Sequence, residues 1–153
     1  MYKCLELLKP GIYMLLVRLD KDFLGKISSL GTVKLSKGLY IYVGSARRGL
    51  LNRLKRYCLR NIRKLHWHID YLLIHGEALG AYIIPSKHLS ETHIVNALLR
   101  VLEQSIPRFG ATDTKDPTHL FKYHREKFKD IIKGYKAMYI SCNEILKCLN
   151  ILS

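Results

Sequence analysis

The fold is decided by residues 10–19, which read PGIYMLLVRL. Pro10 and Gly11 break any preceding element, and the residues that follow them are bulky and, apart from Arg18, uncharged. Both alternating faces of this run are apolar, a pattern typical of a central strand that is covered on both sides. Residues 39–43, LYIYV, have the same character and end at Gly44. These two runs predict the two strongest strands of the protein.

Working outward, the other elements follow from changes in period and from turn residues. We expect a third strand over 78–84, a short strand over 32–35, a loop over 25–31, a short edge strand near Phe121 and a loop over 107–117. Helices are predicted from 47 or 49 to 65, and over 66–73, 90–104, 125–133 and 141–152. Ser90 is the predicted N-cap of the third helix, and Glu91 lies favourably in its first turn.

The composition limits the class of protein. The chain has 153 residues, 48% of them apolar, which suits one packed domain and excludes a fully disordered basic tail. No apolar run approaches the about 18 residues of a membrane span, and the first residues lack the pattern of a signal peptide. The cysteines at 4, 58, 142 and 148 show no CxxC pairing. We therefore expect free thiols in a reducing cytoplasm, in preference to disulfides or a zinc site.

The positive charge is concentrated. The chain carries 26 Lys+Arg against 12 Asp+Glu, a net charge of +14, and no acidic residue occurs between Asp22 and Asp70. That block contains Lys26, Lys34, Lys37, Arg47, Arg48, Arg53, Lys55, Arg56, Arg60, Arg63 and Lys64. A polyanion is the expected partner, with counterion release supplying much of the affinity. A solvated basic face without function and an anionic membrane surface are the two alternatives.

A paired motif connects these features. Gly11-Ile12-Tyr13 is followed some 28 residues later by Tyr42-Val43-Gly44, then by Ser45-Ala46 and by Arg53 on the next predicted helix. This set resembles the signature of the GIY-YIG nuclease superfamily. The chain is most similar to a small uncharacterised branch whose members occur alone or fused to the DNA glycosylase endonuclease III. The branch resemblance is carried by Lys37-Gly38 and by the segments 66–72, 109–113 and 117–121, and it spans roughly residues 10–123.

The resemblance implies a fold, an activity and a set of site residues. The fold would be an α/β domain with a small antiparallel sheet, three-stranded at its core and flanked by helices, over 1–123, with a helical extension over 124–153. The activity would be metal-dependent hydrolysis of a phosphodiester. Position by position, Tyr13 would activate or position water, Arg53 would hold the scissile phosphate and Glu91 would bind one divalent cation. Tyr42 matches the second-motif tyrosine, and His66 a catalytic-face histidine for which His68 is an alternative.

The residue types suit this chemistry. A guanidinium offers planar donors that fit phosphate oxygens, and a carboxylate suits Mg²⁺, with Mn²⁺ as a substitute. Tyrosine, with an ordinary pKa of about 10, needs nearby positive charge to act as a base. Because the basic helix of the acid-free segment, or the metal, would supply this charge, we expect the pKa of Tyr13 to be lowered.

Each assignment has a structural alternative. Tyr13 and Tyr42 could be packing aromatics of their strands, Arg56 competes with Arg53 on charge alone, and Glu91 could be only a helix-start acid. Asp113 and His119 could form a second polar cluster near the active face or could fix a loop. The chain also departs from its relatives: Thr114 and Asp116 replace two cysteines, and Tyr57 replaces a histidine.

The functional expectation is a cytoplasmic, Mg²⁺-dependent endonuclease that cuts structured or damaged DNA in repair or recombination. The expected DNA contacts are Arg47, Arg48, Lys55, Arg56, Arg60, Arg63 and Lys64. One alternative is a non-catalytic nucleic-acid-binding module that accompanies a DNA glycosylase or another repair protein. A second alternative is an RNA-processing nuclease. No membrane partner is expected.

Overall fold

The computed structural model describes residues 2–60 and 62–152 and has a single antiparallel sheet at its centre. The sheet has five strands in the order β6-β4-β1-β5-β7, and every neighbouring pair is antiparallel. Its bounds are β1 Gly11–Leu19, β4 Gly38–Ala46, β5 Glu77–Pro85, β6 Leu120–Lys122 and β7 Met138–Ser141. The α/β class is as predicted, but the sheet has five strands where a three-stranded core was expected. Strands β6 and β7 complete the sheet at its two edges and are short: β6 is the edge strand expected near Phe121, whereas no strand was expected over β7.

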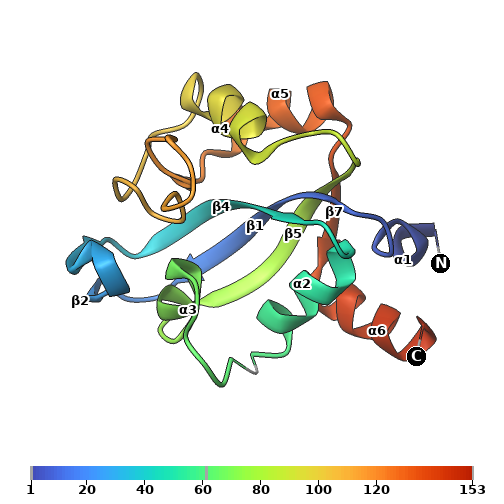
Figure 1. Cartoon of the computed structure of the whole chain (residues 1–153), viewed down its shortest axis with the longest axis horizontal. Helices are drawn as coiled ribbons and strands as arrows, with labels where there is room; N and C mark the ends of the chain where they lie inside the picture. The colour runs from blue at the N-terminus through green and yellow to red at the C-terminus, as the bar shows by residue number, and fades with distance from the viewer. Residues whose placement is uncertain (1, 61, 153) are drawn as a thin grey trace.

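Helices cover both faces of this sheet (Figure 1). On one face lie α4 (Glu91–Leu99) and α5 (Arg125–Tyr135), and on the other lie α2 (Leu50–Cys58), α3 (His68–Leu73) and α6 (Cys142–Leu152). Strand β1 is buried on both sides because its residues alternate between two apolar cores. Ile12, Met14 and Leu16 pack with α4 and α5, whereas Tyr13, Leu15 and Val17 pack with the other helices. The prediction of a doubly covered central strand is confirmed.

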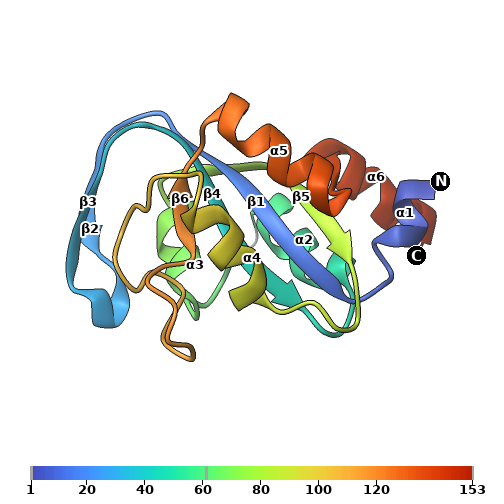
Figure 2. The same ribbon diagram turned by 90° about the horizontal axis from the view of Figure 1, so that it is seen from above.

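A two-stranded ribbon extends from one end of this body (Figure 2). Its strands are β2 (Phe23–Lys26) and β3 (Thr32–Leu35), joined through the short 3-10 helix η1 (Ser28–Leu30). The ribbon turns Phe23, Val33 and Leu35 towards the core. Strand β3 was expected, but β2 begins before the predicted 25–31 loop and overlaps its start, because pairing with β3 supplies hydrogen bonds that the local sequence does not reveal.

Two further predicted boundaries are wrong. Helix α2 ends at Cys58 and α4 at Leu99, although the apolar stripes continue to Leu65 and Leu102. The chain turns after each end: Leu102 still packs into the core from outside α4, whereas Leu65 is exposed. Ser90 is the N-cap of α4 as predicted, because its side chain accepts a hydrogen bond from the His93 backbone N–H at 3.1 Å.

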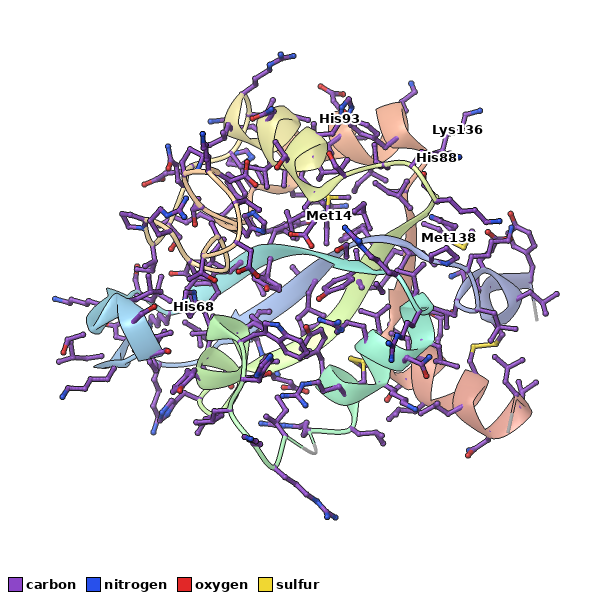
Figure 3. All side chains as sticks on the ribbon, viewed as in Figure 1. Met14, His68, His88, His93, Lys136 and Met138 are labelled. Atoms are coloured by element: carbon purple, nitrogen blue, oxygen red, sulfur yellow. A yellow bond between two sulfur atoms is a disulfide. The ribbon has the colours of Figure 1, made fainter. Side chains whose placement is uncertain are left out.

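The cysteines form two disulfides, Cys4–Cys148 and Cys58–Cys142 (Figure 3), so the prediction of free thiols is wrong. The first joins the N-terminal helix α1 (Tyr2–Glu6) to α6, and the second joins the end of α2 to the start of α6. Partners 144 and 84 residues apart cannot be inferred from spacing in the sequence. Within 2–60 and 62–152, no helix is long and apolar enough to cross a membrane.

Candidate active site

An open cleft of about 930 Å³ lies at the end of the sheet where β1 begins and β4 ends. Register explains why the motif residues meet there: Gly11 pairs with Ala46, and Tyr13 pairs with Gly44. The start of α4 closes the cleft on one face of the sheet and α2 closes it on the other. Four of the five predicted catalytic residues line it, namely Tyr13, Tyr42, Arg53 and Glu91. The structure therefore brings together residues that are up to 78 positions apart in the sequence.

The two motif glycines allow the backbones and the Tyr13 ring to approach closely. A Cβ at Gly44 would overlap the ring of Tyr13, and a Cβ at Gly11 would overlap the backbone of β5 at Ile84. Their role is packing, as the sequence indicated, and it places the Tyr13 hydroxyl directly beneath the cleft floor.

The tyrosines form a buried group under the cleft. The Tyr13 hydroxyl lies 2.8 Å from the hydroxyl of Tyr57, and the ring of Tyr42 lies 6.5 Å from that of Tyr13. Burial raises the pKa of Tyr13 well above its ordinary value, Tyr57 and Tyr42 raise it further, and Arg53 lowers it by less. The pKa of Tyr13 is therefore raised by its protein surroundings, contrary to the expected lowering. Tyr57, at the position where the resemblance implied a histidine, is a hydrogen-bond partner of Tyr13 that the sequence did not reveal.

Arg53 lies between these tyrosines and Trp67. Its guanidinium carbon is 4.2 Å from the centroid of the Trp67 ring, within the range of a cation–π contact. Burial opposes the positive charge, but the neighbouring Tyr13 and Tyr57 offset this effect and raise the pKa of Arg53. The side chain is thus held charged, half-buried and at the cleft wall, which suits it to bind an anionic oxygen.

Glu91, on α4, lines the same cleft as Arg53, and its carboxylate accepts two hydrogen bonds. Its Oε1 accepts from the Ser45 hydroxyl at 2.5 Å, and its Oε2 lies 3.1 Å from Nδ1 of His119. Burial raises the pKa of Glu91, but the hydrogen bonds from His119 and Ser45 outweigh burial and leave it lowered. Glu91 is consequently ionised at neutral pH.

His119 and Asp116 complete this cluster. The His119 ring is buried, and its Nε2 lies 2.8 Å from Oδ2 of Asp116. Burial lowers the pKa of His119, but the two carboxylates more than compensate and leave it raised. The sequence had pointed to Asp113 and His119 together. The structure instead pairs His119 with Asp116, and Asp113 lines the cleft.

The two candidate histidines have different positions. His68 is buried at the first position of α3 (Figure 3), accepts a hydrogen bond from the Gly110 backbone N–H at 2.8 Å and packs against Phe109. It is the structural histidine of the pair. His66 is exposed and contacts Trp67 edge-on, with the ring centroids 4.6 Å apart. It is not among the residues that line the cleft, and its catalytic role stays a prediction.

The basic residues predicted to bind DNA do not form one uniform surface. Arg47 and Arg48 are exposed and line a second hollow that shares Arg53, Trp67 and Glu91 with the cleft. Lys87 and His88, which sequence reasoning did not select, line the cleft itself. The remaining predicted contacts lie along α2 or after it: Lys55, Arg56, Arg60, Arg63 and Lys64.

Arg56 points towards the protein instead of the solvent. Its guanidinium donates to Oδ2 of Asp70 at 2.7 Å, and Asp70 is completely buried. The same oxygen accepts hydrogen bonds from the backbone N–H groups of His66 and Trp67. Arg56 therefore supports the turn that presents Trp67 to Arg53, whereas its predicted contact with DNA stays untested.

The donor set around Glu91 is compatible with a hydrated Mg²⁺. Among residues 2–60 and 62–152, no cluster of three or more acidic, histidine or cysteine side chains could hold a metal by itself. Mg²⁺ is commonly held by one or two carboxylates together with waters and substrate phosphates. Glu91 offers one ionised carboxylate on the cleft, so the residues fit a cation whose remaining ligands are waters, some of which substrate phosphate would replace when DNA is bound.

Comparison with known proteins gives the family. The model of the family described as "Domain of unknown function DUF123" matches residues 12–140 of the chain. The chain belongs to this family. No curated protein and no solved structure gave a match.

Proposed function

We propose that the chain is a divalent-metal-dependent DNA endonuclease of the GIY-YIG type. The observation that carries the proposal is the convergence of Tyr13, Arg53 and Glu91 on one cleft, with Arg47 and Arg48 beside it. Hydrolysis of a phosphodiester requires a positioned water, neutralisation of the phosphate charge and stabilisation of the leaving oxygen. These three residue types can provide these functions.

Each side chain has a role that its surroundings support. Glu91 would hold Mg²⁺ or Mn²⁺, which supplies charge neutralisation when bound. Arg53, held charged against Trp67, would bind a non-bridging phosphate oxygen. Tyr13 is protonated at neutral pH in this state, so it would orient the attacking water through its hydroxyl and would not act as a standing phenolate.

The substrate would be structured or damaged DNA, and the setting repair or recombination. The acid-free basic segment and the exposed arginines at the cleft suit a nucleic-acid backbone, and a polar, open cleft can accept a distorted strand. A DNA glycosylase or another repair protein is the proposed partner. Cleavage of RNA in preference to DNA, which the experiment below also tests, would redirect this proposal to an RNA-processing nuclease.

One observation favours the rival, a non-catalytic binding module. Both oxygens of Glu91 already accept hydrogen bonds, and Tyr13 is only 1% exposed. A binding module would keep the basic surface but would have no use for a charged Glu91 on the cleft. The two proposals differ in whether the protein cuts the phosphodiester bond of the DNA that it binds.

The test is cleavage of a labelled panel of duplex, nicked, flap, four-way-junction, abasic and single-stranded DNA with matched RNA, in Mg²⁺, Mn²⁺ or chelator. We expect metal-dependent cutting of one or more DNA structures and its loss in Glu91→Gln. Glu126→Gln is the matched control, because Glu126 also lies in the first turn of a helix but is not among the residues that line the cleft. Salt-sensitive binding without cutting, equal in both variants, would establish the binding module.

A further inference from the structure

A buried histidine between two carboxylates connects the start of α4 to the loop before β6. His119 is 1% exposed, Asp116 is 5% exposed, and the Thr92 hydroxyl donates to Asp116 Oδ2 at 3.0 Å. Glu91 and Asp116 come from different elements and meet only through this ring. The chemistry proposed above uses Glu91 and leaves the other members of the cluster without a role.

The contacts determine how the ring is oriented. Nδ1 is surrounded by acceptors, Glu91 Oε2 at 3.1 Å and the Val43 carbonyl at 3.3 Å. Nε2 faces the carboxylate of Asp116 at 2.8 Å. Nε2 therefore donates to Asp116, and the Nδ1–H is shared between Glu91 Oε2 and the Val43 carbonyl. Ser45 donates to the other oxygen of Glu91, so the plane of the Glu91 carboxylate is held at both ends.

Holding the loop is not a sufficient reason for this arrangement, because the loop has its own clamp. The Arg108 guanidinium donates to the backbone carbonyls of Asp116 at 2.6 Å and Thr114 at 2.7 Å, and also to that of Ala111. These bonds close the segment 108–116 without His119. The contact between His119 and Glu91 is therefore not needed to hold the loop, and it acts on a side chain that lines the cleft.

We propose that His119, held by Asp116, is a positioning residue that orients the Glu91 carboxylate for a divalent cation. The proposal rests on the function proposed above and extends it to residues outside the cleft lining. Each oxygen of an ionised carboxylate has two lone pairs, so Glu91 can keep its bonds to Ser45 and His119 and still present lone pairs to a cation. Groups that orient a metal ligand in this way typically contribute about 10–100-fold to metal affinity.

Two substitutions of His119 separate its two hydrogen bonds. In His119→Asn the amide nitrogen can occupy the place of Nδ1 and donate to Glu91, while the contact with Asp116 is lost. In His119→Gln the amide nitrogen can occupy the place of Nε2 and donate to Asp116, while the contact with Glu91 is lost. If His119 only packed the core or fixed the loop, His119→Gln would not bind Mn²⁺ more weakly than His119→Asn does.

The measurement is the dissociation constant of Mn²⁺ in the full chain without DNA, from the electron paramagnetic resonance signal of free Mn²⁺. We expect His119→Gln to raise the constant about tenfold or more and His119→Asn to leave it within about threefold of wild type. Asp116→Asn keeps the side-chain volume and removes the charge that faces Nε2, so it should also raise the dissociation constant of Mn²⁺. This variant provides the test if a His119 variant does not fold. Circular dichroism and thermal unfolding establish which variants are folded.

The outcomes distinguish failure of this inference from failure of the proposed function. If Glu91→Gln abolishes Mn²⁺ binding while folded His119→Gln and Asp116→Asn bind as wild type does, the positioning role is overturned and the metal site stands. If Glu91→Gln leaves Mn²⁺ binding unchanged, the metal role of Glu91 fails, and both proposals fail with it.

Discussion

Replacing Arg56 tests whether the turn beneath the cleft depends on a buried ion pair. Asp70 is completely buried, and its Oδ2 accepts three hydrogen bonds, from the Arg56 guanidinium and from two backbone N–H groups, those of His66 and Trp67. In Arg56→Ala the carboxylate would keep the two backbone donors but lose its only counter-charge among these partners. The variant therefore leaves a buried, uncompensated charge.

The expected cost is a loss of about 3 kcal/mol in the free energy of unfolding. Removing one partner of a buried ion pair typically costs about 3–5 kcal/mol. The lower end applies because the backbone donors remain and because the Arg56 side chain is 27% exposed, which already screens part of the pair. For a chain of this size the loss corresponds to a fall in Tm of about 6–12 °C.

Urea unfolding followed by tryptophan fluorescence measures this loss directly, because Trp67 is the single tryptophan and lies on the turn concerned. Arg48→Ala is the matched control: it removes the same charge from an exposed position and should change the unfolding free energy by less than about 0.5 kcal/mol. Asp70→Asn in the Arg56→Ala background should recover part of the loss, since an amide needs no counter-charge. A loss below about 1 kcal/mol in Arg56→Ala would refute the reasoning.

Three further outcomes are expected. Arg53→Lys keeps the charge but loses the planar fork, so the rate of DNA cleavage should fall about a hundredfold while equilibrium binding of DNA without metal changes little; equal losses in both would argue against a phosphate contact. Reduction of the two disulfides, which close loops spanning 144 and 84 residues, should lower the unfolding free energy by up to about 4 kcal/mol for either bridge; a thermal transition insensitive to reductant would contradict the pairing. Burial lowers the pKa of His68 from its ordinary 6.5, so its contribution to stability is complete above that pH and is lost as the pH falls through the lowered pKa. Wild type should therefore lose stability as the pH falls below about 6.5 more steeply than His68→Asn, whose amide oxygen accepts from Gly110 at any pH; parallel pH profiles would exclude this role.

The central strands and the main site residues could be predicted because their signals are local. The apolar alternation of β1 and β4 reports two covered faces, and the glycines at 11 and 44 mark the points where a Cβ has no room. The resemblance to the nuclease family then implied Tyr13, Tyr42, Arg53 and Glu91 as site residues, and the structure places all four on one cleft. The N-cap at Ser90 followed from its own side-chain chemistry.

Strands β7 and β2 could not be predicted in the same way, although the short edge strand β6 was expected near Phe121. Strand β7 has four residues between two helices, and it is a strand because the free edge of β5 is available to pair with it. Strand β2 likewise depends on β3. A short segment has too few residues for a period to be recognised, and its hydrogen bonds come from a distant partner.

The sequence by itself determined the class of the fold, the two central strands and the basic character of the chain, since each depends on residue type and near spacing, and its motifs carried the resemblance that implied the cleft residues. The tertiary structure alone decided which cysteines pair, that Arg56 faces Asp70, that Tyr13 is buried with a raised pKa, and that His119 links Glu91 to Asp116. Pairing, burial and pKa depend on groups brought together across many intervening residues, and only the packed chain specifies their distances.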